Sequence, residues 1–514
     1  MLNKKVNLIK FKIFVVTLAG LLLYYILYPS SNYLTQSDAE RVIFILSWLG
    51  IIELIYIIKT WRKLTGRYLT LYNIFMVFFF LFNFGESILW AFGIHVDQEL
   101  GTTNLYYYLP VPTGNDIIQT QLIVLISGLM IHFGAILLKK QAATDDTYTL
   151  SGLVSKISDK QKMLFKFSIL ISPIVILSEF YYLFVNYLNA QTYGYTALYY
   201  NDEIVGTNVV IQILTRLFLP VLIGMLIGSG YSKKIVRFVY ILFGINVVLS
   251  LLVGDRGGWF YSLCILIVCH HFYYKKIHLK HIVLFTILGT VLTYVSVAVV
   301  AVRNKGVSID KVVNAINGLD ANPIISSIFN MGGTMKVTTV LTMNGWDIFP
   351  YGNTFLYGLL IAPPTKDVID WLDLNYKSVG GWFSQEYLGI SNGAGFSIVA
   401  EMLINFGPIL LPFFMIAFGL FIYWITDIEY KNPNTETLKI IFCIITTAVV
   451  VNISRNVFNY IAGEIIYTTI QFFVYFIVFR TFFARKINSK NKVQSVYSYE
   501  HSAISTQKFS SSEY

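Results

Sequence analysis

The sequence has few charged residues. Only 13% of its 514 residues are Asp, Glu, Lys or Arg, well below the roughly 25% that is typical of soluble proteins. Apolar residues make up 56% of the chain and aromatic residues 16%. Because so few charges cannot cover the water-exposed surface of a chain this long, the composition excludes a soluble protein. It predicts a polytopic membrane protein instead.

Cysteine and histidine are also scarce. The three cysteines, Cys264, Cys269 and Cys443, lie inside apolar segments, so we expect buried small side chains rather than a disulfide framework. The seven histidines show no metal-binding spacing such as HExxH, and the sequence contains no P-loop or Rossmann fingerprint. We therefore expect neither a metal nor a cofactor.

Long apolar runs are what the sequence has in abundance. A bilayer core about 30 Å thick needs roughly 20 apolar residues of helix to cross it. The predicted fold is therefore all-α, a polytopic membrane protein with about 12 transmembrane helices. The predicted spans are 11–28, 41–58, 70–93, 117–138, 165–188, 209–229, 235–253, 257–273, 282–302, 408–426, 438–454 and 464–483.

The distribution of Lys and Arg predicts the orientation of these spans. Lys4, Lys5, Lys10 and Lys12 precede the first span, and basic residues then recur mainly in every second loop. Since cytoplasmic loops are rich in Lys and Arg, both termini are expected in the cytoplasm. The formal net charge of +10 is thus a topology signal and not a nucleic-acid-binding one. No small-x-small cleavage site follows the first span, which we interpret as a retained helix.

This topology leaves one long loop on the outer side, residues 303–395. Within it, Ser308 is expected to cap a helix through Ile316, and Phe355 to Ala362 is apolar but too short to span, so we expect a re-entrant or surface-lying segment. An amphipathic element is expected from Lys366 to Leu374. The predicted organisation is a membrane domain of nine spans (1–302), the outer loop (303–395), the last three spans (396–487) and a disordered cytoplasmic tail (488–514).

Four arginines are expected near the outer membrane face, where arginine is normally rare. Arg216 lies within a predicted span, Arg256 lies in the turn Gly254-Asp255-Arg256-Gly257, and Arg303 and Arg455 lie at the ends of spans. Alone, each has an ordinary explanation: a structural ion pair or snorkelling for Arg216, a solvated turn for Arg256 and an interfacial anchor for Arg303. Together they favour a phosphate or pyrophosphate site, because the arginine fork suits bidentate phosphate contacts.

A carboxylate and two tyrosines complete the candidate site. Glu401 lies on a short apolar helix broken at Gly407-Pro408, where a carboxylate must face something polar. It is either a general base or the structural partner of an arginine. Tyr195 and Tyr199 lie in an outer loop, where tyrosine serves either as part of an interfacial belt or as a platform for sugar rings.

Short motifs in chain order resemble the Wzy-type polysaccharide polymerases, and they cover most of the chain. One departure is Asn330-Met331-Gly332-Gly333, where the family often carries an acidic residue; this puts any role for that position in doubt. The matching motifs are Phe78 to Gly85 with Trp90 to Gly93, Gly194 to Tyr199, Thr215-Arg216 with Leu219-Pro220, Gly254 to Gly257, Asn322 to Ile325, Gly395 to Glu401 with Asn405 to Gly407, and Ser454 to Asn456.

The resemblance implies a membrane glycosyltransferase with a GT-C-like helical bundle. Such enzymes join oligosaccharide repeat units carried on undecaprenyl pyrophosphate, at the outer face of the bacterial cytoplasmic membrane. The implied partners are this lipid-linked oligosaccharide, the bilayer and a chain-length-regulating co-polymerase, with no nucleic acid. On this basis Glu401, Arg216 and Arg256 are the expected catalytic residues. Arg216, Arg256, Arg303, Arg455, Tyr195 and Tyr199 are expected to bind the pyrophosphate and sugars.

Two other functions remain compatible with the sequence. One is a ligase that transfers a finished glycan from the same carrier to another acceptor. The other is a transporter or flippase, although transporters usually have paired halves with broken helices near the midplane. Here the arginines and the long loop gather on one side, and this asymmetry favours an enzyme.

Overall fold

The computed structural model describes residues 2–139, 157–199, 208–255, 257–277, 279–318, 322–362, 371, 373, 377–390, 393–429 and 431–482. All regular elements in these ranges are helices. Ten stretches are long and apolar enough to cross a membrane, and α9 and the second half of α10 are shorter apolar helices. The predicted all-α, polytopic fold is therefore confirmed.

The observed helices have bounds close to those of the predicted spans. The sixth span is interrupted between α6 and α7, and α17 is broken at Gly407, just before the tenth span. The helices are α1 (Leu2–Ser30), α2 (Gln36–Thr65), α3 (Leu71–Ala91), α4 (Gly114–Leu138), α5 (Asp159–Tyr193), α6 (Val209–Thr215), α7 (Phe218–Gly228), α8 (Lys233–Val253), α9 (Gly258–Tyr273), α10 (Leu279–Val302), α17 (Ile398–Thr426), α18 (Thr437–Val450) and α19 (Phe458–Ile465), which continues through a π-helical turn.

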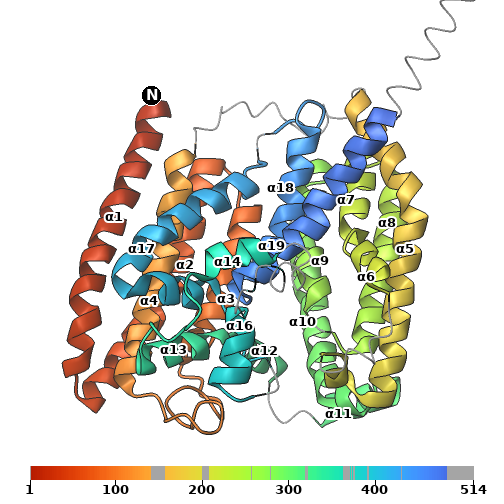
Figure 1. Cartoon of the computed structure of the whole chain (residues 1–514). Helices are drawn as coiled ribbons and strands as arrows, with labels where there is room; N and C mark the ends of the chain where they lie inside the picture. Colours follow the sequence, from red (N-terminus) through yellow and green to blue (C-terminus); the bar gives the residue numbers. More distant parts are fainter. Residues whose placement is uncertain are drawn as a thin grey trace, which may run out of the picture.

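The segment between α10 and α17 contains short helices: α11 (Ile309–Asn317), α12 (Pro323–Met331), α13 (Thr334–Asn344), α14 (Thr354–Ile361) and α16 (Val379–Trp382). The predicted cap of the first is present, because the Ser308 hydroxyl accepts from the Lys311 amide. Helices α11, α12 and α13 lie at one end of the bundle, called here the lower end, and the N-terminus lies at the opposite, upper end (Figure 1). Most of the predicted amphipathic element 366–374 and the whole tail 488–514 lie outside the described residues.

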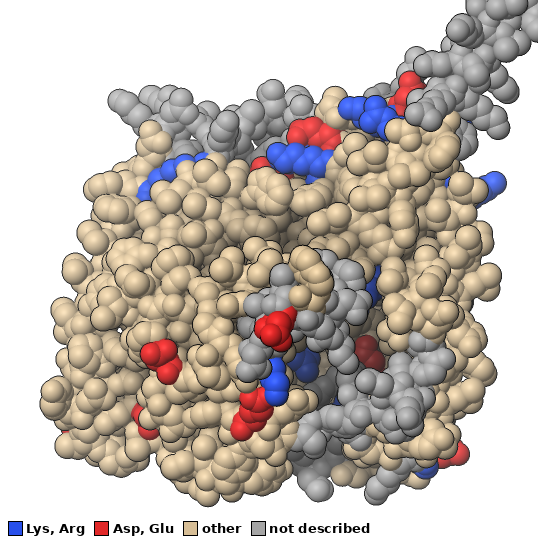
Figure 2. Space-filling model, in the orientation of Figure 1, with Lys and Arg blue, Asp and Glu red and all other residues tan. Residues whose placement is uncertain are grey.

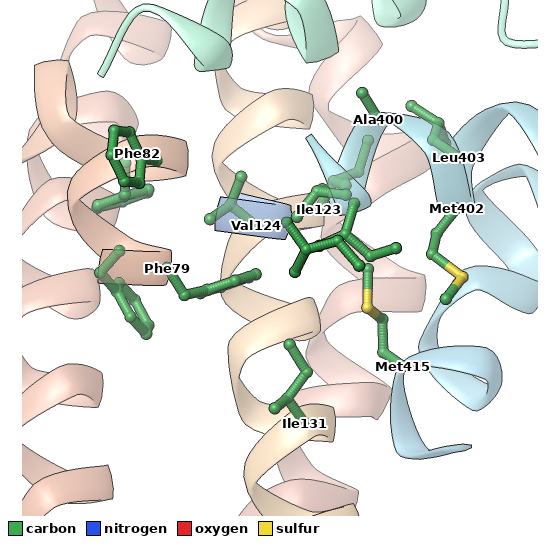
Figure 3. Packing of buried hydrophobic residues seen from close by; sticks show 14 of the residues in the cluster. Phe79, Phe82, Ile123, Val124, Ile131, Ala400, Met402, Leu403 and Met415 are labelled. Carbon is green, nitrogen blue, oxygen red and sulfur yellow. The ribbon is translucent and has the colours of Figure 1, made fainter. Parts of the chain in front are cut away.

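Two groups of helices each enclose a hydrophobic core. The first core lies mainly among α2, α3, α4 and α17, and the second among α5, α7, α8, α9 and α18. Figure 3 shows how Phe79, Ile123 and Met415 converge from three helices of the first core. Figure 1 shows α14, α16 and α19 between the two groups. A site built from these central helices therefore draws on both halves of the protein.

Helix α3 is held against the α12–α13 segment by direct backbone contact. A Cβ on Gly85 would lie 2.7 Å from the Gly332 Cα atom, so only glycine permits this approach. The Thr334 hydroxyl donates to the Phe82 carbonyl over 2.5 Å. Gly332, in the segment Asn330-Met331-Gly332-Gly333, therefore serves the close packing of this segment against α3.

Helix α17 is broken at Gly407, as the sequence predicts. Gly407 has a φ of 65° and a ψ of 174°, and Pro408 and Pro412 follow it in the same helix. Because Pro412 has no amide hydrogen, the Pro408 carbonyl loses its helical donor. The hydroxyl of Tyr24 in α1 donates to that carbonyl over 2.8 Å, and Tyr25 donates to the next carbonyl, of Ile409, over 2.6 Å.

Candidate functional site

Arg303 and Tyr195 lie together at the end of α10. The chain leaves α5 through Gly194, whose φ is 83°, and Tyr195 then packs with its side chain buried. The Arg303 guanidinium carbon lies 4.4 Å from the centre of the Tyr195 ring, a cation–π arrangement. A Cβ on Gly254 would lie 3.0 Å from both side chains, so the turn after α8 packs directly against this pair.

Arg455 lies on the other side of the same turn. Its guanidinium carbon is 5.8 Å from the centre of the Phe82 ring, and it lies beside the hydroxyl of Tyr261. A Cβ on Gly257 would lie 3.5 Å from Arg455 Nη1. The turn 254–257 thus contacts Arg303 through its first residue and Arg455 through its last.

The structure therefore brings together Arg303, Arg455 and Tyr195 around one turn. The turn is tight, because the Gly257 amide donates to Asp255 Oδ1 over 3.0 Å. Arg256, the expected third cation, lies outside the described residues. In the part of the chain that the structure describes, no carboxylate lies within ion-pairing distance of Arg303 or Arg455. Each of the two guanidinium groups lies against an aromatic ring.

Arg216 has a different environment. It lies at the break between α6 and α7, and its guanidinium forms an ion pair with the carboxylate of Glu464 in α19. The ring of Tyr467 lies 5.6 Å from the guanidinium carbon. This is the structural ion pair that the sequence left open as one explanation. Its role as an anion ligand stays a prediction.

Glu401 is buried, with a residue exposure of 1%. One carboxylate oxygen accepts from the Thr354 hydroxyl over 2.6 Å and the other from the Phe458 amide over 2.7 Å. These partners are a hydroxyl and a backbone amide rather than an arginine.

The turn Tyr195–Tyr199 also carries Tyr199, whose side chain lies outside the described residues.

Two further carboxylates that the sequence analysis did not single out lie beside basic residues. Glu464 is partly buried and pairs with Arg216. Glu86 in α3 is completely buried, accepts from the Leu100 amide over 2.9 Å and lies 3.8 Å from the Lys336 ammonium group. Both residues lie in predicted spans, where an acidic side chain is costly and needs a partner. That cost is the signal in the sequence that marks Glu86 and Glu464.

The lower half of the molecule is hollowed near its centre, and blue and red side chains are recessed there (Figure 2). Two arginines that flank one turn and have no carboxylate partner among the described residues suit the recognition of a diphosphate, because each guanidinium fork can hold two phosphate oxygens. Among the described residues, no group of three or more His, Cys, Asp or Glu side chains could hold a metal ion.

Comparison with known proteins identifies the family. No curated protein and no solved structure matches the chain. The family model described as O-antigen polysaccharide polymerase Wzy matches residues 9–486, nearly the whole chain. The protein therefore belongs to this family of multi-pass bacterial membrane proteins that polymerise polysaccharide.

Proposed function

We propose that the protein polymerises oligosaccharide repeat units carried on undecaprenyl pyrophosphate, and that Arg303, Arg455 and Arg256 bind the diphosphate. In this reaction the glycosyl carbon–oxygen bond to the diphosphate of the growing chain breaks. A new bond forms between that carbon and a hydroxyl at the non-reducing end of the incoming unit. The hydroxyl proton passes to a base, and undecaprenyl pyrophosphate leaves.

The arginines would act on the leaving group. Negative charge develops on the diphosphate as the glycosyl bond breaks, and cations held in fixed positions stabilise that charge. Arg303 and Arg455 lie against aromatic rings and have no carboxylate partner among the described residues, so they need not leave such a partner first. Tyr195 would keep the Arg303 fork in place and, with Tyr199, line the path of the sugars.

The lower end would face the outside of the cytoplasmic membrane. Figure 1 shows the N-terminus at the upper end, and the last described helix runs from the centre up to that end. The lysine-rich N-terminal segment belongs in the cytoplasm by the positive-inside rule. The helix α14, from the long segment 303–395, lies at mid-height, which supports a re-entrant element of the outer loop. A chain-length-regulating co-polymerase would be a further partner on that side.

The observation that supports this proposal most directly is that Arg303 and Arg455 lie on either side of one turn without a carboxylate partner among the described residues. The test uses membranes that contain the protein and synthetic lipid-linked repeat units. Arg303→Ala and Arg455→Ala should each abolish products longer than a single repeat. Arg41→Ala, which removes an exposed arginine of α2, is the matched control and should retain the full ladder.

Three results would contradict the proposal. The first is a full ladder from both Arg303→Ala and Arg455→Ala at normal protein levels. The second is a wild-type product of a single block transferred to a foreign acceptor, which would indicate a ligase. The third is activity with a lipid monophosphate donor as high as with the diphosphate, because the site would then not recognise a diphosphate.

A further inference from the structure

Glu401, in the first turn of α17, lies where the beginnings of α14 and α19 meet α17. Thr354 is the first residue of α14, Phe458 is the first residue of α19, and Glu401 lies in the first turn of α17. Each of the two helix starts donates one hydrogen bond to the carboxylate. A single side chain therefore joins three segments that are distant in the sequence.

Asn405 completes this junction from the next turn of α17. Its amide nitrogen donates to the Thr354 hydroxyl and to the Glu401 carbonyl, each over 2.7 Å. Its side-chain oxygen accepts from the Thr354 amide over 2.9 Å. The first backbone N–H groups of a helix have no partner within the helix. The junction supplies an acceptor for the first N–H group of α14 and for one N–H group at the start of α19.

The junction lies close to Arg455 along the chain. Arg455 precedes Phe458 by three residues, and two other contacts hold the same segment. The Asn83 side chain donates to the Ser454 carbonyl over 3.2 Å, and the Phe396 amide donates to the Arg455 carbonyl over 3.3 Å. The bond from Phe458 to Glu401 is the third tether and the one that fixes the beginning of α19.

We infer that Glu401 is a positioning residue, which ties the α14 segment to α19 and holds Arg455 against Phe82. This inference rests on the proposed role of Arg455 in diphosphate binding. A general base must present an oxygen to the acceptor hydroxyl. Both oxygens of Glu401 already accept hydrogen bonds within the protein, and the residue is 1% exposed.

The first test compares Glu401→Gln with Glu401→Ala. The glutamine oxygen can still accept from the Phe458 amide, so Glu401→Gln should retain at least about a tenth of the wild-type rate, with the pH–rate profile unchanged in shape. Glu401→Ala leaves buried donors unsatisfied, and its rate should fall by about a hundredfold. A loss of about 10²–10⁴-fold in Glu401→Gln, with an altered acidic limb of the profile, would show a general base and overturn the inference.

The second test measures the coupling to Arg455. Thr354→Val removes one donor to Glu401 while it keeps the shape of the side chain, and Thr354→Ser should restore function. If the junction acts through Arg455, the combined loss in Thr354→Val/Arg455→Lys should be clearly smaller than the product of the single losses. Strictly multiplicative losses would mean that the junction supports only general stability, and would overturn the inference.

These outcomes are separate from those that test the proposed function. Binding of a soluble polyprenyl diphosphate analogue to wild type and to Arg455→Ala shows whether Arg455 contacts the diphosphate. If Arg455→Ala binds as well as wild type, the proposed site is wrong whatever Glu401 does. If only Arg455→Ala loses binding while Thr354→Val and Glu401→Ala bind as wild type does, the site stands and the positioning role is wrong.

Discussion

The guanidinium of Arg216, at the break between α6 and α7, pairs with the carboxylate of Glu464 in α19. The two residues are 248 positions apart in the sequence, and Tyr467 covers one face of the pair. The ion pair links the break in the sixth span to α19, the helix whose first amide is held by Glu401. Because the partner of Arg216 is known, substitutions of both residues can distinguish a structural role of Arg216 from a role in binding the diphosphate.

Arg216→Ala should lower the amount of folded protein, because it leaves the carboxylate of Glu464 in a largely apolar region. If the pair is structural, Arg216→Met/Glu464→Gln should recover most of the loss, since removal of both charges avoids an unpaired one. The measurement is the thermal unfolding midpoint in detergent, together with the polymer ladder. A double variant that is stable but makes no polymer would instead assign Arg216 to the diphosphate.

A methyl group added to the turn after α8 should disturb the arginine site. Gly254 has a φ of 103°, and its added Cβ would lie 3.0 Å from Arg303 and Tyr195. Gly254→Ala should therefore reduce polymerisation by about tenfold or more, since the left-handed region costs an L-residue roughly 1–2 kcal/mol. Gly244→Ala in the same helix is the control, because nothing lies within 4 Å of its added Cβ; equal activities would contradict the packing described.

The face of the Tyr195 ring, rather than its hydroxyl, should matter for Arg303. Tyr195→Phe keeps the ring under the guanidinium and should retain activity within about threefold. Tyr195→Ala removes the cation–π contact, worth about 0.5–2 kcal/mol depending on desolvation, and should reduce activity by about tenfold. Initial rates of repeat addition measure the difference. A Tyr195→Phe variant as weak as Tyr195→Ala would assign the effect to the hydroxyl.

A buried ionic cluster at the end of α4 should set the acid limit of stability. Lys139 pairs with Asp427 over 3.0 Å and with Glu429 over 3.2 Å, and Lys431 pairs with Asp427 over 2.8 Å. Burial alone would raise the pKa of Asp427, but Lys139 and Lys431 outweigh it and hold the pKa below its usual value. Burial likewise opposes the positive charge of Lys139, yet its acidic neighbours raise its pKa.

The signs of these two shifts predict the pH dependence. The contribution of Asp427 is complete above its unfolded pKa of about 3.9 and is lost as the pH falls through its lower folded value. The contribution of Lys139 is complete below about 10.4 and is lost only at still higher pH. We expect the contribution of this cluster to the unfolding midpoint to be constant between about pH 5.5 and 8.5 and to fall below about pH 4. Lys139→Met should lower the midpoint throughout, because it strands two carboxylates; a midpoint equal to that of wild type would contradict the cluster's role.

Much of the fold could be predicted because it depends on local signals. Apolar length located the spans, the Ser308 side chain marked the start of α11, and Gly407-Pro408 marked the break in α17. The candidate site could be predicted only in part. The sequence predicted one membrane depth for Arg303 and Arg455 but not their contacts with the turn 254–257. Those contacts, and the contacts of Glu401 with Thr354 and Phe458, depend on how helices pack. Periodicity and charge do not report such long-range contacts.

Helix α1 carries a consequence for anyone who shortens this chain. Its outward surface is apolar, and it looks like a simple anchor. Yet Tyr24 supplies the hydrogen that Pro412 cannot give to the Pro408 carbonyl. Without the first thirty residues, the Pro408 carbonyl at the break in α17 would have no hydrogen-bond donor in the hydrocarbon region of the bilayer. Removal of the N-terminal segment would then destabilise α17, which lies almost four hundred residues later in the sequence. A Tyr24→Phe substitution would remove the same hydrogen bond without removing any span.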